Sequence, residues 1–279
     1  MRTRRVLPAA ALLASALVVF AGVAGVAPAR SAPTWAPAAT AAVHPGVQTL
    51  TDGAQCTANF IYYDSTNVYI GQAAHCSGTG GNTETDGCSS GTLPVGTKVT
   101  VDGASKPGTM IYNSWITMQG AGEKDADTCA FNDLALVQLD PADVGKVNPS
   151  VPRWGGPIGL AGSTAMLEQV YSYGNSSLRA GITQLSPKTG VSLGSDSGGW
   201  NNTVYTLTPG IPGDSGSGFL NSTGQAFGIL STVQILPLAG ANGVGTLAQE
   251  LTYLHSHVSS LSGVQLANGT EPFRGGLPL

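Results

Sequence analysis

The sequence predicts an all-β protein, an antiparallel barrel or sandwich that ends in one amphipathic helix. Short runs rich in β-branched and aromatic residues recur along the chain, and turn residues such as "DSTN" and "NSTG" separate them. Glycine and proline are abundant, whereas long helical periodicity is almost absent. The predicted strands are residues 58–63, 67–75, 96–103, 109–118, 134–140, 168–174, 202–208 and 225–232.

Residues 1–29 have the three parts of a secretory signal peptide. Three arginines among the first five residues make a positive start, residues 7–26 are apolar, and Ala27-Pro28-Ala29 is a small-x-small cleavage site. An N-terminal membrane anchor is the alternative, since the apolar run is near spanning length. No later stretch is apolar enough to span a bilayer. We therefore expect an exported protein without membrane contact after signal removal.

The chain that remains after removal of residues 1–29 is acidic. It holds nine basic and sixteen acidic residues, a net charge of about −7. No basic patch is interleaved with aromatic residues, so we expect no nucleic-acid partner. Its length, about 250 residues, fits one large all-β unit or two small domains.

The four cysteines of this exported chain predict two disulfides. Counting alone leaves all three pairings open. A four-thiolate metal site is the alternative, but the sequence has no Cys-x-x-Cys pair to build one. We therefore predict no metal site and no cofactor. The cysteines are Cys56, Cys76, Cys88 and Cys129.

The second half of the chain follows a connector and ends in a helix. Residues 141–157 are rich in proline and glycine, which predicts the connector. Residues 246–261 carry apolar residues at helical spacing, and Thr246 with Gln249 three residues later predicts a capping box. Residues 262–279 are predicted to form a flexible tail.

One histidine has the setting of a catalytic base. Nucleophilic catalysis by serine needs a base, an acid that orients it, backbone N–H groups for an oxyanion, and a serine on a tight turn. His75 closes an apolar strand and precedes Cys76, so a disulfide would hold it in place. His44 precedes the first strand, and His255 and His257 lie off the apolar stripe of the terminal helix, where we interpret them as solvated.

Asp133 is the candidate acid. It stands at the start of the apolar strand in "FNDLALVQLD". A buried carboxylate needs a partner, and His75 would supply one. The alternative is an Asx turn that only starts the strand.

The triplet Asp-Ser-Gly occurs twice, around Ser197 and around Ser215. Gly213 lies two residues before Ser215, where the missing side chain lets its N–H turn toward an oxyanion. Ser195 occupies the equivalent position before Ser197. After Ser215 the chain continues into a turn and the apolar strand 225–232, and this hairpin could form one wall of a substrate cleft. We therefore predict Ser215 as the nucleophile and interpret Ser197 as a loop residue.

The segments "GQAAHC", "NDLALV" and "GDSGSG" together resemble the chymotrypsin/trypsin family of serine proteases, in the family's order His, Asp, Ser. The resemblance covers residues 49–261. Within the family, the chain looks like the secreted proteases of high-GC Gram-positive (actinobacterial) organisms. It implies two antiparallel six-stranded β-barrels, at residues 49–146 and 147–245, with the site in the cleft between them. A short N-terminal segment, residues 30–48, would precede the first barrel.

The resemblance also implies a role for each candidate residue. His75 would act as general base and then as acid toward the leaving amine, and Asp133 would orient it. Ser215 would attack, and the N–H groups of Gly213 and Ser215 would form the oxyanion hole. Ser231 would match the start of the substrate-binding segment. The resemblance further implies disulfides Cys56–Cys76 and Cys88–Cys129.

The chain departs from the family pattern in three places. In activated members of the family, an Ile/Val-Val-Gly-Gly-like N-terminus supplies an amine that pairs with the Asp before the nucleophile. No such start precedes the first barrel here, so Asp214 needs another partner. We therefore predict no cleavage-driven activation switch. Pro209 aligns with the position of the pocket aspartate in trypsin-like members, so cleavage after Arg or Lys is not expected. Val233 falls where the family often has a glycine at the pocket mouth, which favours small or apolar substrate side chains.

The expected function is that of a secreted, extracellular serine endopeptidase, a monomer that acts on protein or peptide substrates. One alternative is a catalytically silent protease-fold binding protein, against which the intact candidate residues argue. A second is a secreted α/β-hydrolase esterase, which needs alternating helices and the order Ser, Asp, His. This chain has the reverse order.

Overall fold

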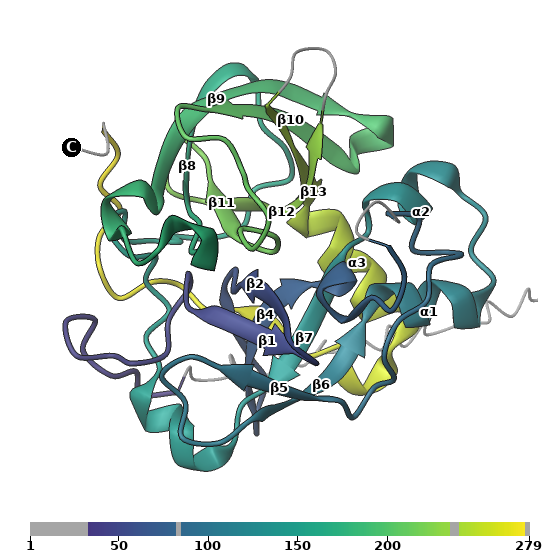
Figure 1. The fold of residues 1–279 in the computed structure, drawn as a ribbon, viewed down its shortest axis with the longest axis horizontal. Helices are drawn as coiled ribbons and strands as arrows, with labels where there is room; N and C mark the ends of the chain where they lie inside the picture. Colours follow the sequence, from purple (N-terminus) through teal and green to yellow (C-terminus); the bar gives the residue numbers. More distant parts are fainter. Residues whose placement is uncertain (1–32, 82–84, 235–239, 277–279) are drawn as a thin grey trace, which may run out of the picture. The chain divides into compact units, whose positions relative to one another are not determined.

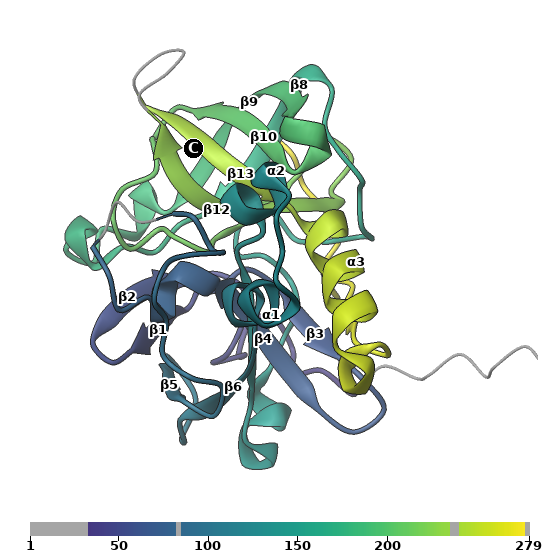
Figure 2. The ribbon, with the colours of Figure 1, turned by 90° about the vertical axis from the view of Figure 1, so that its right-hand side faces the viewer.

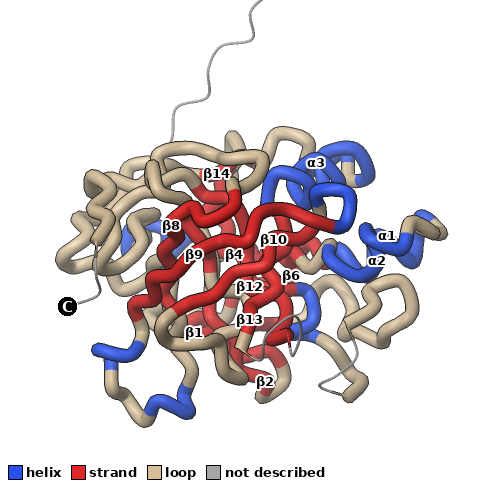
Figure 3. The backbone as a smooth tube through the Cα atoms, turned by 90° about the horizontal axis from the view of Figure 1, so that it is seen from above, coloured by secondary structure: helices blue, strands red, loops and turns tan. Residues whose placement is uncertain are grey.

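The computed structural model describes residues 33–81, 85–234 and 240–276. The predicted signal peptide, residues 1–29, lies outside the described residues. Strands make up most of the regular structure, as the all-β prediction requires (Figure 3). In the described ranges, every helix is too short or too polar to cross a lipid bilayer.

The first half of the chain, together with β14 from the C-terminal end, forms an antiparallel sheet of eight strands in the order β14-β3-β4-β7-β6-β5-β1-β2 (Figure 1). Its interior is filled by β-branched and aromatic side chains such as Val99, Val137 and Trp115. The strands are β1 (Gln48–Thr51), β2 (Ala54–Thr57), β3 (Ile61–Tyr63), β4 (Val68–Ala73), β5 (Lys98–Val101), β6 (Gly108–Asn113), β7 (Leu134–Gln138) and β14 (Gln265–Leu266).

A bend in the chain joins β2, at one edge of this sheet, to β3, which lies next to the other edge strand β14. β2 pairs with β1, and β3 pairs with β4. At the bend, the Ala58 N–H donates to Val47 O and its carbonyl accepts from Gly46 N, while Asn59 N donates to Gly71 O, all at 2.9 Å. The resemblance implies a closed six-stranded first barrel. The structure instead has an eight-stranded sheet, in which β2 and β3 form one bent strand that pairs with β1 at one end and with β4 at the other, without a continuous ladder.

The second half forms a closed six-stranded barrel in the order β10-β13-β12-β11-β8-β9, which confirms the prediction for this half. Closure leaves none of these six strands with an unpaired edge. Inside, Phe219 and Phe227 pack edge to face with ring centroids 6.0 Å apart. The strands are β8 (Met166–Tyr173), β9 (Pro187–Asp196), β10 (Asn201–Thr206), β11 (Gly218–Leu220), β12 (Ala226–Gln234) and β13 (Ala241–Thr246).

The prediction of a continuous strand over residues 109–118 is wrong. β6 ends at Asn113, and α1 (Ser114–Ala121) begins directly after it. The Asn113 side chain accepts two backbone N–H groups from the first turn of α1, which is the bonding of a helix N-cap. A second helix, α2 (Ala126–Phe131), was also not predicted and is capped in the same way by Asp125.

The predicted terminal helix is confirmed as α3 (Leu247–His257), followed by a 3-10 turn at Ser259–Leu261. The predicted capping box does not form. The Thr246 hydroxyl instead accepts a hydrogen bond from Asn202 Nδ2 at 2.9 Å, and among the described residues no side chain caps the helix. Tertiary contact with β10 has taken the place of the local cap.

Residues 262–276 are ordered, so the prediction of a flexible tail is wrong for them. β14 pairs with β3, and the Phe273 ring packs on Tyr171 with centroids 5.3 Å apart. Both contacts bury apolar surface, which an unstructured tail would leave in water. Residues 277–279 lie outside the described part of the chain.

Helix α3 lies beside both halves of the fold (Figure 2). Its apolar face packs into one cluster together with side chains from the sheet and from the barrel. This shared core fixes the end of β4 and the start of β7 opposite the turn before β11, where the candidate residues stand. The cluster includes Phe60, Tyr62, Tyr112, Leu134, Tyr171, Leu220, Ile229, Leu247, Leu251 and Leu254.

Candidate active site

A cavity of about 840 Å³ lies between the sheet and the barrel. His75 and the Cys56–Cys76 disulfide line one side, and Ser215 lies opposite, with Gly213, Ser231 and Val233. Pro209 does not line this cavity, although the next residue, Gly210, does. The structure thus brings all but one of the non-cysteine candidates to the cavity or, like Asp133, directly behind it.

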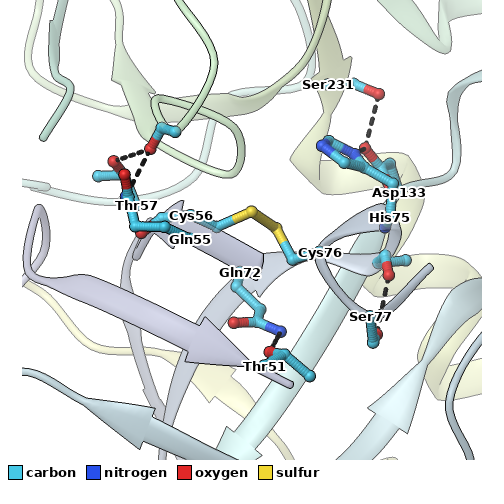
Figure 4. Close-up of a disulfide and its surroundings, with 12 residues drawn as sticks. Thr51, Gln55, Cys56, Thr57, Gln72, His75, Cys76, Ser77, Asp133 and Ser231 are labelled. Atoms are coloured by element: carbon cyan, nitrogen blue, oxygen red, sulfur yellow. Dashed lines mark hydrogen bonds and ion pairs between the residues drawn. A yellow bond between two sulfur atoms is a disulfide. The ribbon is translucent and has the colours of Figure 1, made fainter. Parts of the chain in front are cut away.

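His75 and Asp133 form a direct pair (Figure 4). His75 lies in the 3-10 turn after β4 (Ala74–Ser77), and Asp133 directly precedes β7. Because Ala73 pairs with Leu134 across these two strands, the two side chains meet. His75 Nδ1 lies 2.7 Å from Asp133 Oδ2, and His75 N donates to Asp133 Oδ1 at 2.9 Å. The buried carboxylate therefore places the proton on Nδ1 and leaves Nε2 as the acceptor.

Ser231 adds a further donor to the same carboxylate. Its hydroxyl donates to Asp133 Oδ2 at 2.7 Å (Figure 4). For Ser231 the resemblance implies only a place at the start of the substrate-binding segment, so this side-chain contact was missed. Asp133 is only 2% exposed, and its carboxylate accepts hydrogen bonds from both His75 and Ser231.

Both disulfides pair as the resemblance implies, Cys56 with Cys76 and Cys88 with Cys129. The first ties β2 to the turn that carries His75 (Figure 4). The second ties the loop before β5 to α2, the helix that leads into Asp133. Each cross-link therefore restrains a segment next to a candidate residue.

The turn before Ser215 holds the backbone in the conformation that an oxyanion hole needs. Asp214 N donates to Ile211 O at 2.9 Å, and Gly213 has φ +95°, which is a type II turn. This positive φ favours glycine, and a Cβ at Gly213 would also lie 2.3 Å from Gln55 Oε1. Across residues 33–81, 85–234 and 240–276, no internal acceptor takes the N–H of Gly213 or of Ser215. Both donors remain available to an oxyanion.

Ser215 and His75 line the same cavity, but no hydrogen bond joins the Ser215 hydroxyl to the imidazole in the described structure. Such contacts are often long without a substrate and tighten in the complex. The other candidate serine, Ser197, starts a 3-10 turn after β9 and does not line the cavity. The geometry therefore favours Ser215 over Ser197.

The structure was compared with solved structures. Thermobifida fusca Protease A superposes with a TM-score of 0.53 at 18% identity, covering 82% of this chain and all of that one. The chain has the chymotrypsin-like serine protease fold. A protein described as a glutamic acid specific serine protease superposes with a TM-score of 0.51 at 17% identity, over 81% of this chain and 100% of its own. Neither a family model nor a curated protein sequence matches this chain.

Within this chymotrypsin-like fold, Asp214 has two cationic partners that the sequence did not identify. Its Oδ2 accepts from Arg179 Nη2 and lies 3.0 Å from Lys188 Nζ. The side chains of Arg179 and Lys188 are only 6% and 0% exposed. Burial lowers the pKa of Lys188, although the charge of Asp214 opposes this shift. The expected need of Asp214 for a partner other than an N-terminal amine is thus met inside the barrel.

Two further residues support the same turn. The Ser176 hydroxyl donates to Pro212 O at 2.5 Å, and the Ser176 N–H donates to Asp214 Oδ1 at 3.1 Å. Thr57 Oγ1 donates to Gly213 O at 2.7 Å. These bonds hold the carbonyl groups on either side of the Gly213 N–H away from the cavity. No local motif around Ser176 or Thr57 indicated this role.

The pKa of His75 has a testable consequence. Burial alone would lower it, but the charge of Asp133 and the hydrogen bond to it outweigh burial and raise the pKa above its usual 6.5. Only neutral His75 can accept a serine proton, so we expect kcat/KM to fall on the acid side with an apparent pKa above 6.5.

Asp133→Asn should move the acid limb of the kcat/KM profile to lower pH. The substitution removes the negative charge that raises the pKa of His75, while the burial that lowers this pKa remains. It should also lower kcat by about 10⁴-fold, since the neutral amide no longer selects the correct tautomer. Rate profiles of both proteins with a chromogenic peptide between pH 4 and 9 check this. A wild-type limb at or below 6.5 would contradict it.

Proposed function

We propose that this protein is a secreted serine endopeptidase that hydrolyses peptide bonds through an acyl-enzyme. One observation carries the proposal: His75, paired with the buried Asp133, faces a cavity that also holds Ser215 and the unbonded N–H of Gly213. These are the parts that serine acyl transfer needs. The fold is compatible with this chemistry and does not by itself require it.

The reaction would proceed in two halves. His75 Nε2 takes the proton of the Ser215 hydroxyl as Oγ attacks the peptide carbonyl, and the N–H groups of Gly213 and Ser215 bind the resulting oxyanion. The imidazolium then gives its proton to the leaving amine, and the C–N bond breaks. A water molecule, deprotonated by His75, attacks the acyl-enzyme and releases the carboxylic acid and Ser215.

We further propose that the enzyme acts outside the cell as a monomer on protein or peptide substrates. The two disulfides support this location, because such bonds persist in oxidising compartments. The sequence of residues 1–29 supports export in the same way.

Labelling with a fluorophosphonate tests the proposal. This probe reacts with an activated serine, and digestion followed by mass spectrometry locates the modified residue. We expect the label on Ser215 and parallel cleavage of a chromogenic peptide. A folded protein that takes no label would favour the silent binding protein instead.

The substrate pocket is narrow beside Gly210. A Cβ built on Gly210 would lie 2.6 Å from Asn242 Oδ1, 3.1 Å from Leu230 Cδ2 and 3.3 Å from Val233 Cγ2. Val233 therefore lies opposite Gly210 and narrows the pocket that would receive a substrate side chain. We propose a preference for small or apolar residues before the cleaved bond.

Replacing Val233 with glycine should widen this pocket. We expect kcat/KM for a substrate with Phe before the cleaved bond to rise about 10- to 100-fold relative to one with Ala, the usual worth of one to two apolar groups in a pocket. A panel of chromogenic peptides measures the ratio for both proteins. Strongest wild-type cleavage after Arg would contradict the proposed pocket.

A further inference from the structure

Glu250 is a fully buried carboxyl group directly behind the candidate acid. It lies on α3 with 0% exposure, and its Oε1 accepts the backbone N–H of Asp133 at 3.0 Å. A Cβ at Gly245 would lie 3.0 Å from the same oxygen, so the glycine of β13 makes room for the carboxyl group. The proposed mechanism makes no use of this side chain.

No cation faces Glu250 in the described structure. Its titratable neighbours are Asp133, Tyr112 from β6 and Tyr62 from β3. The other elements packed most closely against α3 are α1, β12, β13 and the 3-10 turn Ser259–Leu261, and none of them contains Asp, Glu, Lys, Arg or His. A buried carboxylate without a cationic partner is costly, and such a group keeps its proton instead.

The two adjacent carboxyl groups have unequal surroundings. Asp133 accepts hydrogen bonds from the His75 backbone and ring and from the Ser231 hydroxyl. Glu250 accepts one bond, from the Asp133 peptide. Burial, together with the nearby charge of Asp133, raises the pKa of Glu250 well above its usual range. The neutral form is therefore the favoured one for Glu250, which has one donor and no cation beside it in the described structure.

We propose that Glu250 is a positioning residue whose neutral carboxyl group holds the Asp133 peptide, so that the Asp133 carboxylate stays directed at His75. The inference rests on the proposed function, since it assigns Asp133 the role of orienting His75. A neutral acceptor at this place supports the peptide N–H without adding a second negative charge behind Asp133.

The protonation state can be tested by stability alone. A carboxyl group whose pKa rises on folding stabilises the protein fully below its unfolded pKa, near 4.5, and loses this contribution as pH rises toward its folded pKa. Glu250→Gln removes this loss. Its melting temperature should gain on wild type by about 3 to 5 °C for each pH unit above 5. Glu271→Gln, the same change at an exposed glutamate, is the control for the loss of one charge.

The positioning role is tested by comparing Glu250→Gln with Glu250→Leu. The amide keeps an acceptor for the Asp133 N–H, so we expect kcat within about twofold of wild type and an unchanged acid limb. Leucine removes the acceptor, so we expect kcat to fall about 10- to 100-fold with KM little changed. The Nδ1 proton of His75, observed as a downfield resonance in the proton NMR spectrum, should change its chemical shift in Glu250→Leu and not in Glu250→Gln.

The outcomes separate the two proposals. A pH-independent melting difference, or an acid limb that moves to lower pH in Glu250→Gln, would mean that Glu250 is ionised and would overturn the inference. Full activity of folded Glu250→Leu, with an unshifted His75 signal, would also overturn it. If wild type shows no peptidase activity while the melting and NMR results hold, the positioning of Asp133 stands and the proposed function fails.

Discussion

Ser215→Ala is expected to abolish fluorophosphonate labelling and to lower kcat by about a millionfold, the usual loss when a serine nucleophile is removed. Ser215 lines the cavity with His75, and the N–H groups for an oxyanion lie beside it. The remaining rate would come from oxyanion binding and substrate positioning alone. Labelling and steady-state rates with a chromogenic peptide measure the effect.

Ser197→Ala is the matched control, because Ser197 stands in the other Asp-Ser-Gly triplet of the same barrel. It begins a 3-10 turn away from the cavity, so labelling and rate should stay at wild-type levels. Melting temperatures of both variants show that each is folded. Loss of the label in Ser197→Ala with the label retained in Ser215→Ala would reverse the assignment of the nucleophile.

Asp214→Asn should cost about 3 to 5 kcal/mol of the free energy of unfolding, the usual penalty for breaking a buried ion pair. Two cations, Arg179 and Lys188, would be left without their counter-charge in the barrel interior. Asp214 also accepts the backbone N–H of Ser176 and of Ile211, so the turn that carries Gly213 would loosen. We therefore expect kcat to fall together with stability, as measured by urea unfolding and peptide hydrolysis.

Asp196→Asn provides the comparison for this prediction. Asp196 belongs to the other Asp-Ser-Gly triplet but is exposed, and its partners are the uncharged side chains of Asn201 and Thr203. Its replacement should cost less than about 1 kcal/mol, as is usual at exposed positions. Equal stability of Asp214→Asn and wild type would show that Asp214 does not neutralise the two cations.

The candidate site could be read from the sequence because its reactive groups lie in short motifs. A glycine two residues before a serine, or an aspartate at the start of an apolar strand, can be recognised from a few neighbouring residues. The structure places His75 and Ser215 on one cavity and Asp133 directly behind His75. The contact between His75 and Asp133 spans two neighbouring strands, β4 and β7, whose patterns were also recognisable.

The supporting residues could not be read in this way. Asp214 signals the need for a cation, but any of the nine basic residues after position 29 could have met it, and Arg179 lies 35 positions away. Glu250 is separated from Asp133 by 117 positions. Helix α1 was missed for a local reason, because its β-branched and aromatic residues suit a strand until the Asn113 cap decides otherwise.

By itself, the sequence determined the β-rich class and the terminal helix and indicated the candidate reactive groups, since alternation, helical spacing and turn chemistry are local properties. Only the tertiary structure decided how the bent strand closes the first sheet and which cations neutralise Asp214. It alone placed Glu250 behind Asp133 and ordered residues 262–276 on β3 and Tyr171. Each of these depends on burial and on contacts between distant segments, whose energies no local pattern expresses.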